Sequence, residues 1–218
     1  MNALIALLAL SVPLTLFAAM PADMPAVSHD GLVLQKDTRA AVVYLKPGAS
    51  LGGYDKVQLL PCFVAFQKDW QVQQNKTPMM RQKVTDNDMQ RIRDSLSKEF
   101  NRVFTEELKK DGGYEVVDRP GSNVLLVKPA IIDLVVTAPA VRPSDNLQSQ
   151  RTSAGAMTLY AELYDSVSGD IIARVIDPQV SRDADFEMRD ARLVNREEAD
   201  KILRKWADGL RQKIDTVN

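Results

Sequence analysis

The sequence predicts an α+β protein: a two-layer α/β sandwich in which two amphipathic helices pack on a mostly antiparallel sheet of about five strands. Three observations support this class. Two segments carry apolar residues three and four positions apart, which is the spacing of one helix face. A long apolar segment at 123–137 is typical of a strand buried on both faces. Residues 154–165 alternate between apolar and polar and precede a turn, as in a β-hairpin.

The start of the chain is almost wholly apolar and carries no charged side chain up to Ala19. Such a run, followed by small residues and prolines, is typical of a cleaved export signal, and it is shorter than the roughly 20 apolar residues of a membrane-spanning helix. We therefore expect a signal peptide over 1–19, a flexible leader over 20–39 and a single α/β domain over 40–218. The cleavage site, and whether cleavage occurs, stay open.

Two strands are expected at the start of the domain, Ala41–Leu45 and Lys56–Phe66. The second is nearly continuous in apolar residues, which favours burial on both faces. Pro61 lies inside it and has no N–H to donate, so it indicates an edge position or a bulge. Residues 67–84 are polar and are expected to form a long connection.

The strongest helix signal follows that connection. Thr85 or Asp86 can cap its start, because a side-chain oxygen there accepts a free backbone N–H. Gly112-Gly113 can end it, because glycine adopts the left-handed conformation without steric cost. The apolar face expected for this helix consists of Met89, Ile92, Leu96, Phe100, Val103, Phe104 and Leu108.

The second half of the domain is expected to contain further strands. Tyr114–Val117 is short. Asn123–Thr137, which is either one long strand or two joined at Lys128-Pro129, is the expected centre of the sheet because its apolar residues face both ways. Ala154–Asp165 and Ile171–Val175 are expected to pair as a hairpin, with Gly169 supplying a positive φ.

A second amphipathic helix is expected to close the domain. Asn195 is its expected cap, with Glu198 reaching back in a capping box. Its apolar stripe consists of Ala199, Ile202, Leu203, Trp206, Leu210 and Ile214.

Composition gives little direction to function. The net charge is −1, with both signs interspersed, so no basic face for nucleic acid or anionic lipid is indicated. The single cysteine, Cys62, cannot form an internal disulfide, and its apolar neighbours favour a buried thiol over a reactive or pairing one.

The residues that carry catalysis or bind metals are scarce. The single histidine, His29, lies in the expected leader, which argues against the usual Ser-His-Asp, Cys-His and zinc arrangements. Ser95–Lys98 fits S-x-x-K and Ser144–Asn146 fits S-D-N, but the K-T-G element is missing and Ser95 is expected in mid-helix. The acidic residues of 181–193 alternate with arginines, as on a solvated surface. We expect no catalytic residue, no cofactor and no metal site.

Four sequence motifs follow one another along the domain: Tyr54–Val57, Tyr114–Val117 with Pro120-Gly121, Glu162–Gly169, and Trp206-Ala207 with Leu210-Arg211. In this order and spacing they resemble the motifs of a bacterial family of unknown function, numbered 3313. The resemblance spans roughly residues 40–215. It implies an envelope protein with this fold, since members are commonly described as inferred lipoproteins, but it implies no activity. The chain departs from that pattern because no cysteine lies near Ala19 to accept a lipid.

These observations lead to an expected role rather than a reaction. We expect an exported, non-catalytic periplasmic or secreted protein that is soluble after signal cleavage and binds an envelope protein or another envelope component. Candidate partner-binding residues are Trp70, in the long connection, and Arg142 and Arg151, in the 138–152 loop, because exposed aromatics and arginines are favoured at interfaces. The alternative for Trp70 is that it folds back onto the core. The alternative is a small-ligand carrier or an enzyme whose site the sequence does not reveal. The oligomeric state stays open.

Overall fold

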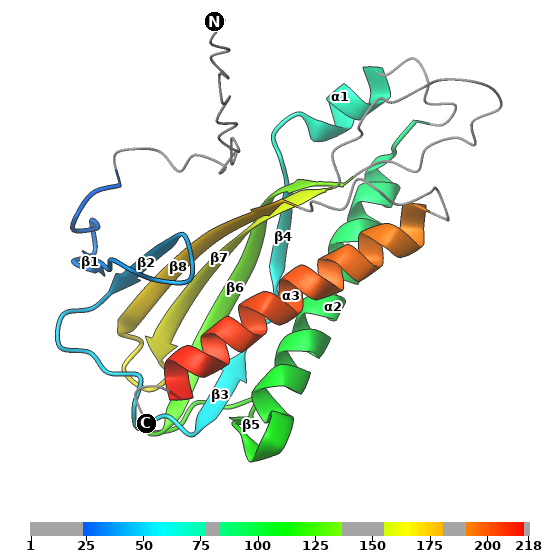
Figure 1. Cartoon of the computed structure of the whole chain (residues 1–218). Coiled ribbons are helices and arrows are strands. Elements are labelled where there is room, and N and C mark those ends of the chain that lie inside the picture. The colour runs from blue at the N-terminus through cyan, green and yellow to red at the C-terminus, as the bar shows by residue number, and fades with distance from the viewer. Residues whose placement is uncertain (1–23, 77–82, 137–154, 181–190, 216–218) are drawn as a thin grey trace, which may run out of the picture.

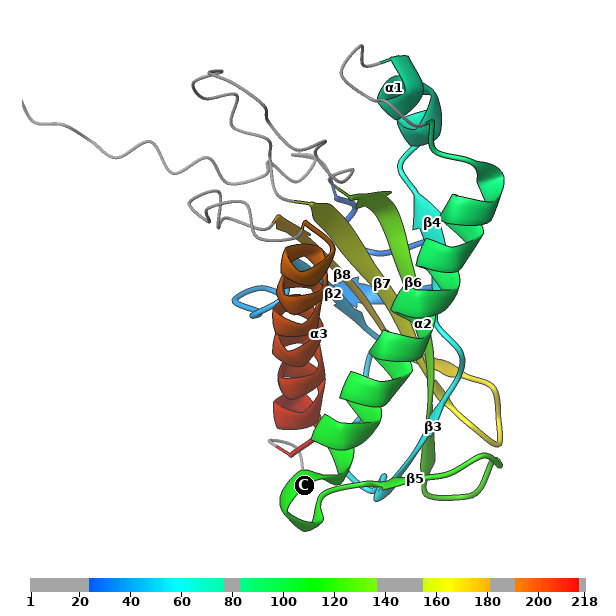
Figure 2. The same cartoon turned by 90° about the vertical axis from the view of Figure 1, so that its right-hand side faces the viewer.

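The computed structural model describes residues 24–76, 83–136, 155–180 and 191–215. These residues form one open sheet of eight strands, with two long helices lying against one of its faces (Figures 1 and 2). The α+β class is therefore confirmed. The counts of five strands and two helices were too low, because the described part holds eight strands and three α-helices.

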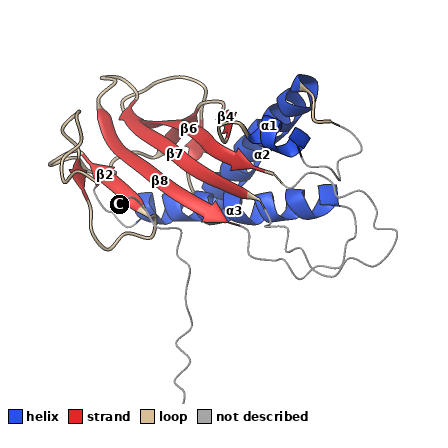
Figure 3. Ribbon diagram, turned by 90° about the horizontal axis from the view of Figure 1, so that it is seen from above, coloured by secondary structure: helices blue, strands red, loops and turns tan. Residues whose placement is uncertain are grey.

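The sheet is mostly antiparallel, as predicted, but it also contains parallel pairs; its order is β1-β2-β8-β7-β6-β3-β5, with β4 also pairing with β6. Neighbours from β1 to β6 are antiparallel, and Figure 3 shows four of these strands, β2, β8, β7 and β6, side by side. β3 and β4 run parallel to β6, and β5 runs parallel to β3. The strands are β1 (Val33–Leu34), β2 (Val42–Leu45), β3 (Lys56–Leu59), β4 (Phe63–Phe66), β5 (Glu115–Val116), β6 (Val124–Val135), β7 (Ala156–Asp165) and β8 (Ile171–Val180).

The sheet begins earlier in the chain than the sequence predicted. Val33 of β1 pairs with Leu45 of β2, and the preceding Leu32 is fully buried against Val42 and Tyr44. The expectation of a flexible leader up to residue 39 does not hold for these residues. A strand of two residues has no periodicity to detect, which is why it was missed. The expected signal peptide, 1–19, lies outside the described residues.

The predicted strand Lys56–Phe66 is two strands, β3 and β4, interrupted around Pro61. Both pair in parallel with the long central strand β6, with Lys56 opposite Val124 and Phe63 opposite Ala130. On its other side β4 has no neighbouring strand in the described part of the chain. The edge position that Pro61 indicated is therefore confirmed for β4.

The three helices differ in how well their ends were predicted. α2 (Asp86–Lys109) begins at Thr85, where the Thr85 hydroxyl accepts from the Asp88 N–H and the Asp88 carboxylate accepts from the Thr85 N–H. A short 3₁₀ turn, η1 (Lys110–Gly112), follows it. α1 (Trp70–Lys76) lies where a connection was expected. α3 (Ala191–Asp215) starts before Asn195, so the capping box expected there is wrong.

The core lies between the two long helices and one face of the sheet. Phe100 and Val103 of α2 and Leu203 of α3 are fully buried in one cluster with Ile131 of β6. A second cluster, which includes Leu108, Leu125 and Ile214, continues it toward the other end of the helices. Because α2 and α3 cover this face, the sheet is accessible on its opposite face and at its edges, of which β4 is one.

Candidate functional site

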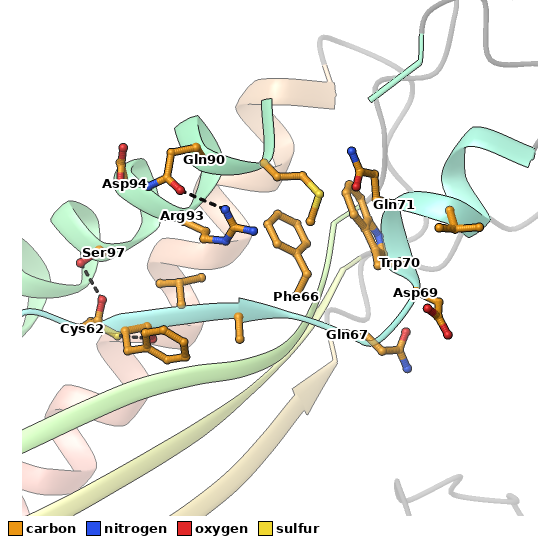
Figure 4. Close-up of a pocket in the computed structure, with 15 residues that line it drawn as sticks. Cys62, Phe66, Gln67, Asp69, Trp70, Gln71, Gln90, Arg93, Asp94 and Ser97 are labelled. Carbon is orange, nitrogen blue, oxygen red and sulfur yellow. Dashed lines mark hydrogen bonds between the residues drawn. The ribbon is translucent and has the colours of Figure 1, made fainter. Parts of the chain in front are cut away.

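An open groove of about 810 Å³ lies along β4, between that strand, α1 and the first half of α2 (Figure 4). Three elements that are separate in sequence form it. β4 contributes Phe63 and Phe66, α1 contributes Trp70, and α2 contributes Met89 and Arg93. The groove therefore combines aromatic and aliphatic surface with a positive charge.

The backbone of β4 is part of this groove. Successive residues of a strand point their N–H and C=O groups to alternate sides. The Gln67 N–H donates to Leu134 O of β6 at 3.0 Å, whereas the Cys62 C=O points the other way and accepts from Ser97 Oγ of α2 at 2.7 Å. Val64 and Phe66 therefore share the direction of Cys62, away from β6.

A register shift between β4 and β6 does not upset this alternation. Val64 pairs with Ile131 and Phe66 with Leu134, so two steps along β4 face three along β6. The extra residue lies in β6, where Asp133 has a left-handed φ of 52°. A bulge bends the strand that carries it, and β4 keeps its regular direction.

Aromatic stacking fixes the end of the groove nearest α1. The rings of Phe66 and Trp70 stack with their centroids 4.6 Å apart, and the Arg93 guanidinium lies 5.6 Å from the centroid of the Phe66 ring. A guanidinium over an aromatic face is attracted by the ring's quadrupole. Arg93 also donates a hydrogen bond to Gln90 Oε1 at 3.0 Å, so the ring contact and this bond together hold it beside the groove.

α1 is tied to the start of α2 by amide side chains. Asn75 makes two hydrogen bonds to the backbone of Val84, donating to its C=O at 3.0 Å and accepting from its N–H at 2.7 Å. Gln71 donates to Asp86 Oδ1 at 2.9 Å. These hydrogen bonds hold α1 to the start of α2, so α1 is a fixed wall of the groove.

Cys62 also lines the groove, but its sulfur is suited to packing rather than reaction. The residue is buried, and burial raises the pKa of its thiol to about 12. Because the thiolate is the reactive species, a thiol with this pKa is inert near neutral pH. The sequence-based expectation of a buried thiol is confirmed.

Of the three predicted partner-binding residues, Trp70 alone lies in the described part of the chain. Trp70 is only 3% exposed, so of its two predicted positions the buried one is observed, and its ring forms a wall of the groove. Arg142 and Arg151 lie outside the described residues. The exposed aromatic of this region is Phe63, whose side chain is 66% exposed and which the sequence analysis missed.

Two local signals could have identified this site. Pro61 already indicated an edge strand, and Phe63 follows it at a position where the side chain points to the opposite face from the buried Val64. The groove itself could not be predicted, because one of its walls is the helix α1. The polar sequence of residues 70–76 carries no periodic apolar signal that would indicate a helix.

Three of the residues considered for catalysis, His29, Ser95 and Lys98, lie in the described part of the chain. His29 is exposed, and Ser95 and Lys98 lie on the exposed face of α2. The S-D-N segment and residues 181–190 lie outside the described part. Within the described residues, His, Cys, Asp and Glu side chains nowhere gather in threes to ligate a metal. None of the helices described is both long and apolar enough to cross a membrane.

A second polar cluster lies on the sheet face that α2 and α3 leave open. Arg174 of β8 bonds Asp30 at 2.5 Å and Glu162 of β7 at 3.0 Å, and the hydroxyls of Tyr160 and Tyr164 donate to the same Glu162. Burial opposes ionisation of Glu162, but the three donors together hold its pKa below the usual value. This cluster fastens the segment before β1 to the sheet, which is a structural task.

Comparison with solved structures finds only distant likeness. The chain is 10% identical to PelC from Paraburkholderia phytofirmans, solved as a dodecamer, over 78% of this chain and 96% of that one, with a TM-score of 0.38. A protein of the family DUF330 from Xanthomonas campestris is 13% identical over 79% of this chain and 91% of that one, with a TM-score of 0.32. No property of either protein is transferred to this chain.

The comparison with protein families is more informative. Among curated proteins none matches the chain. Residues 26–210 match a family described as a protein of unknown function, and this range includes every strand of the sheet and the groove along β4. The family expected from the four sequence motifs is thereby confirmed: the chain belongs to the DUF3313 family.

Proposed function

We propose that this protein is an exported, non-catalytic binding module of the cell envelope, and that its partner is a protein that docks in the groove along β4. Export is supported by the apolar run up to Ala19, and the absence of a nearby cysteine supports a soluble periplasmic or secreted protein after cleavage. A non-enzymatic role is supported by the inert thiol of Cys62 and the exposed position of His29.

The exposed edge of β4 is the observation that carries this proposal. An unpaired strand edge is a template for pairing with another chain, and proteins usually protect such edges with charges, bulges or covering elements. Here the edge carries Phe63, a large aromatic side chain that is 66% exposed. Aromatic residues are enriched at the energetic centre of protein interfaces.

Site-specific photo-crosslinking in the exporting bacterium tests this proposal. A photoreactive phenylalanine analogue at Phe63 should crosslink one protein partner. The same analogue at Val167, which is 67% exposed on the β7–β8 hairpin, is the matched control and should not. Identical products from both positions, or none from Phe63, would refute a partner site in this groove.

The alternative function is a small-ligand carrier or an enzyme. The observation in its favour is the size of the groove, because 810 Å³ falls within the range of ligand sites and the lining mixes apolar and polar groups. Native mass spectrometry of the purified exported protein separates the two functions. A retained small molecule that Phe66→Ala releases would favour the alternative, whereas a protein that carries none favours the partner-binding function.

A further inference from the structure

The groove along β4 combines a backbone edge that is unpaired within the described residues with a fixed side-chain wall. We infer that its occupant is an extended segment of the partner protein, which adds to the sheet as a further strand beside β4 through main-chain hydrogen bonds. This inference rests on the proposed function and adds the mode of binding to it.

The backbone of β4 carries the first step. Val64 and Phe66 point their N–H and C=O groups away from β6, and none of these groups has a bonding partner in the part of the chain that is described. Only another backbone in extended conformation offers donors and acceptors that alternate with the same period. Strand addition of this kind obtains affinity from the main chain and specificity from alternate side chains.

The length of the free edge limits how much of the partner can pair. The next outward carbonyl, that of Cys62, is already bonded to Ser97 Oγ of α2, and Pro61 before it has no N–H. At the other end, the chain turns after Gln67 into α1. The free edge therefore consists of two outward residues, which suits a short segment.

The walls of the groove favour a single strand over a second copy of this chain. α2 lies beside β4 close enough for Ser97 to bond its backbone, and α1 is fixed across the end by Gln71 and Asn75. A second copy would bring a whole sheet, with its own helices, up to this edge. An extended segment needs only the width of one strand, about 5 Å.

Side chains of the added strand would alternate between two environments. Those on the helix side would meet Phe66, Met89 and Arg93, and those on the open side would lie beside Phe63. Cross-strand pairs with an aromatic residue are among the favourable ones in sheets. The geometry thus points to a segment with an apolar residue opposite Phe63.

The test uses the mature protein and a library of linear peptides of random sequence displayed on phage. A selected peptide should bind the wild-type protein and Val167→Ala equally, and should bind Phe63→Ala about tenfold more weakly, the ratio that corresponds to one lost interface aromatic. Enrichment only of peptides that bind Phe63→Ala as well as wild type would overturn the inference.

Amide hydrogen exchange then distinguishes strand addition from side-chain docking. Peptide binding should slow exchange at Val64 and Phe66 by about tenfold or more, while Ala65 and Gln67, which point toward β6, are already slow in the free protein. N-methylation of alternate peptide residues should abolish binding, and the residues between should tolerate it.

Each remaining outcome has a definite meaning. A peptide that needs Phe63 but leaves exchange at Val64 and Phe66 unchanged would overturn strand addition and leave the proposed partner site standing. Slow exchange at these two amides in the free protein, together with a dimeric mass in solution, would place a second copy on the edge and overturn the inference.

Discussion

The two tryptophans of this protein are both buried, but only one has a bonded indole N–H in the described part of the chain. Trp206 Nε1 donates to Asp177 Oδ2 at 2.7 Å, whereas Trp70 Nε1 has no acceptor there. A buried carboxylate that loses a donor costs about 1–3 kcal/mol. Replacing each tryptophan by phenylalanine therefore compares the loss of a bonded indole N–H with the loss of one that has no acceptor in the described residues.

We expect Trp206→Phe to lower the free energy of unfolding by about 1–3 kcal/mol more than Trp70→Phe, since both changes remove the same volume but only the first breaks a bond. Urea unfolding followed by circular dichroism measures the two values. Equal losses would show that the Trp206–Asp177 bond adds nothing to stability.

The reactivity of the Cys62 thiol tests whether this part of the groove stays closed to solvent. Its thiol has a pKa raised to about 12 by burial, so thiolate is nearly absent near neutral pH. We expect a thiol reagent at pH 8 to leave the native protein unlabelled during the time in which it labels the urea-unfolded protein completely. Rapid labelling of the native protein would show that the β4 edge opens to solvent.

Among the elements, α2 depends most clearly on a local signal. The Thr85 hydroxyl accepts from the Asp88 N–H at 3.2 Å, and Thr85→Ala removes this cap. We expect a loss of about 0.5–2 kcal/mol in the free energy of unfolding.

Thr105→Ala is the matched control for that change, because Thr105 lies inside α2, where alanine is the better helix former. Denaturant unfolding should show no loss for Thr105→Ala. A loss as large as that of Thr85→Ala would mean that the cap is not the cause.

The elements also show which parts of the fold a sequence can reveal. α2 was predicted because its apolar face and its Thr85 cap are local, and β6 because both of its faces are buried. β1 and α1 were missed, since a two-residue strand and a polar seven-residue helix have no periodic signal. The parallel pairing of β3 and β4 with β6 joins segments more than sixty residues apart, which no local pattern encodes.

The candidate site, too, has one part with a local sequence signal and one part that depends on contacts between distant segments. Pro61 gave its location on an edge strand, and Phe63 was visible as an aromatic residue beside it. The groove depends on how α1 and α2 lie against β4, and these contacts arise only in the folded chain. This is why the sequence placed Trp70 in this region but left open whether its side chain is exposed or buried.

At the scale of the whole molecule, the segment before β1 is held to the sheet by charge. Asp30 accepts from Arg174, whose guanidinium holds the pKa of that carboxyl well below its usual value. A carboxylate with a lowered folded-state pKa stabilises the protein above its unfolded pKa, which is about 4, and the contribution is lost as pH falls through the folded value.

We therefore expect the free energy of unfolding to fall between pH 7 and pH 3, and to fall less in Asp30→Asn, which has no carboxyl to protonate at this position. Asp170→Asn is the control, because Asp170 pairs with Lys46 on the exposed surface, where such pairs contribute little. Urea titrations at the two pH values provide the comparison. The same pH dependence in Asp30→Asn and wild type would exclude this role for Asp30.

The whole molecule is best understood as a sheet that is closed on one face by α2 and α3 and open along β4. We propose that a partner protein docks in the groove along β4. The most direct measurement uses the partner protein that crosslinking identifies. It is purified and titrated by calorimetry into the wild-type protein, Phe63→Ala and Val167→Ala. We predict about tenfold weaker binding for Phe63→Ala and no change for Val167→Ala. Equal affinities for all three proteins would contradict the claim.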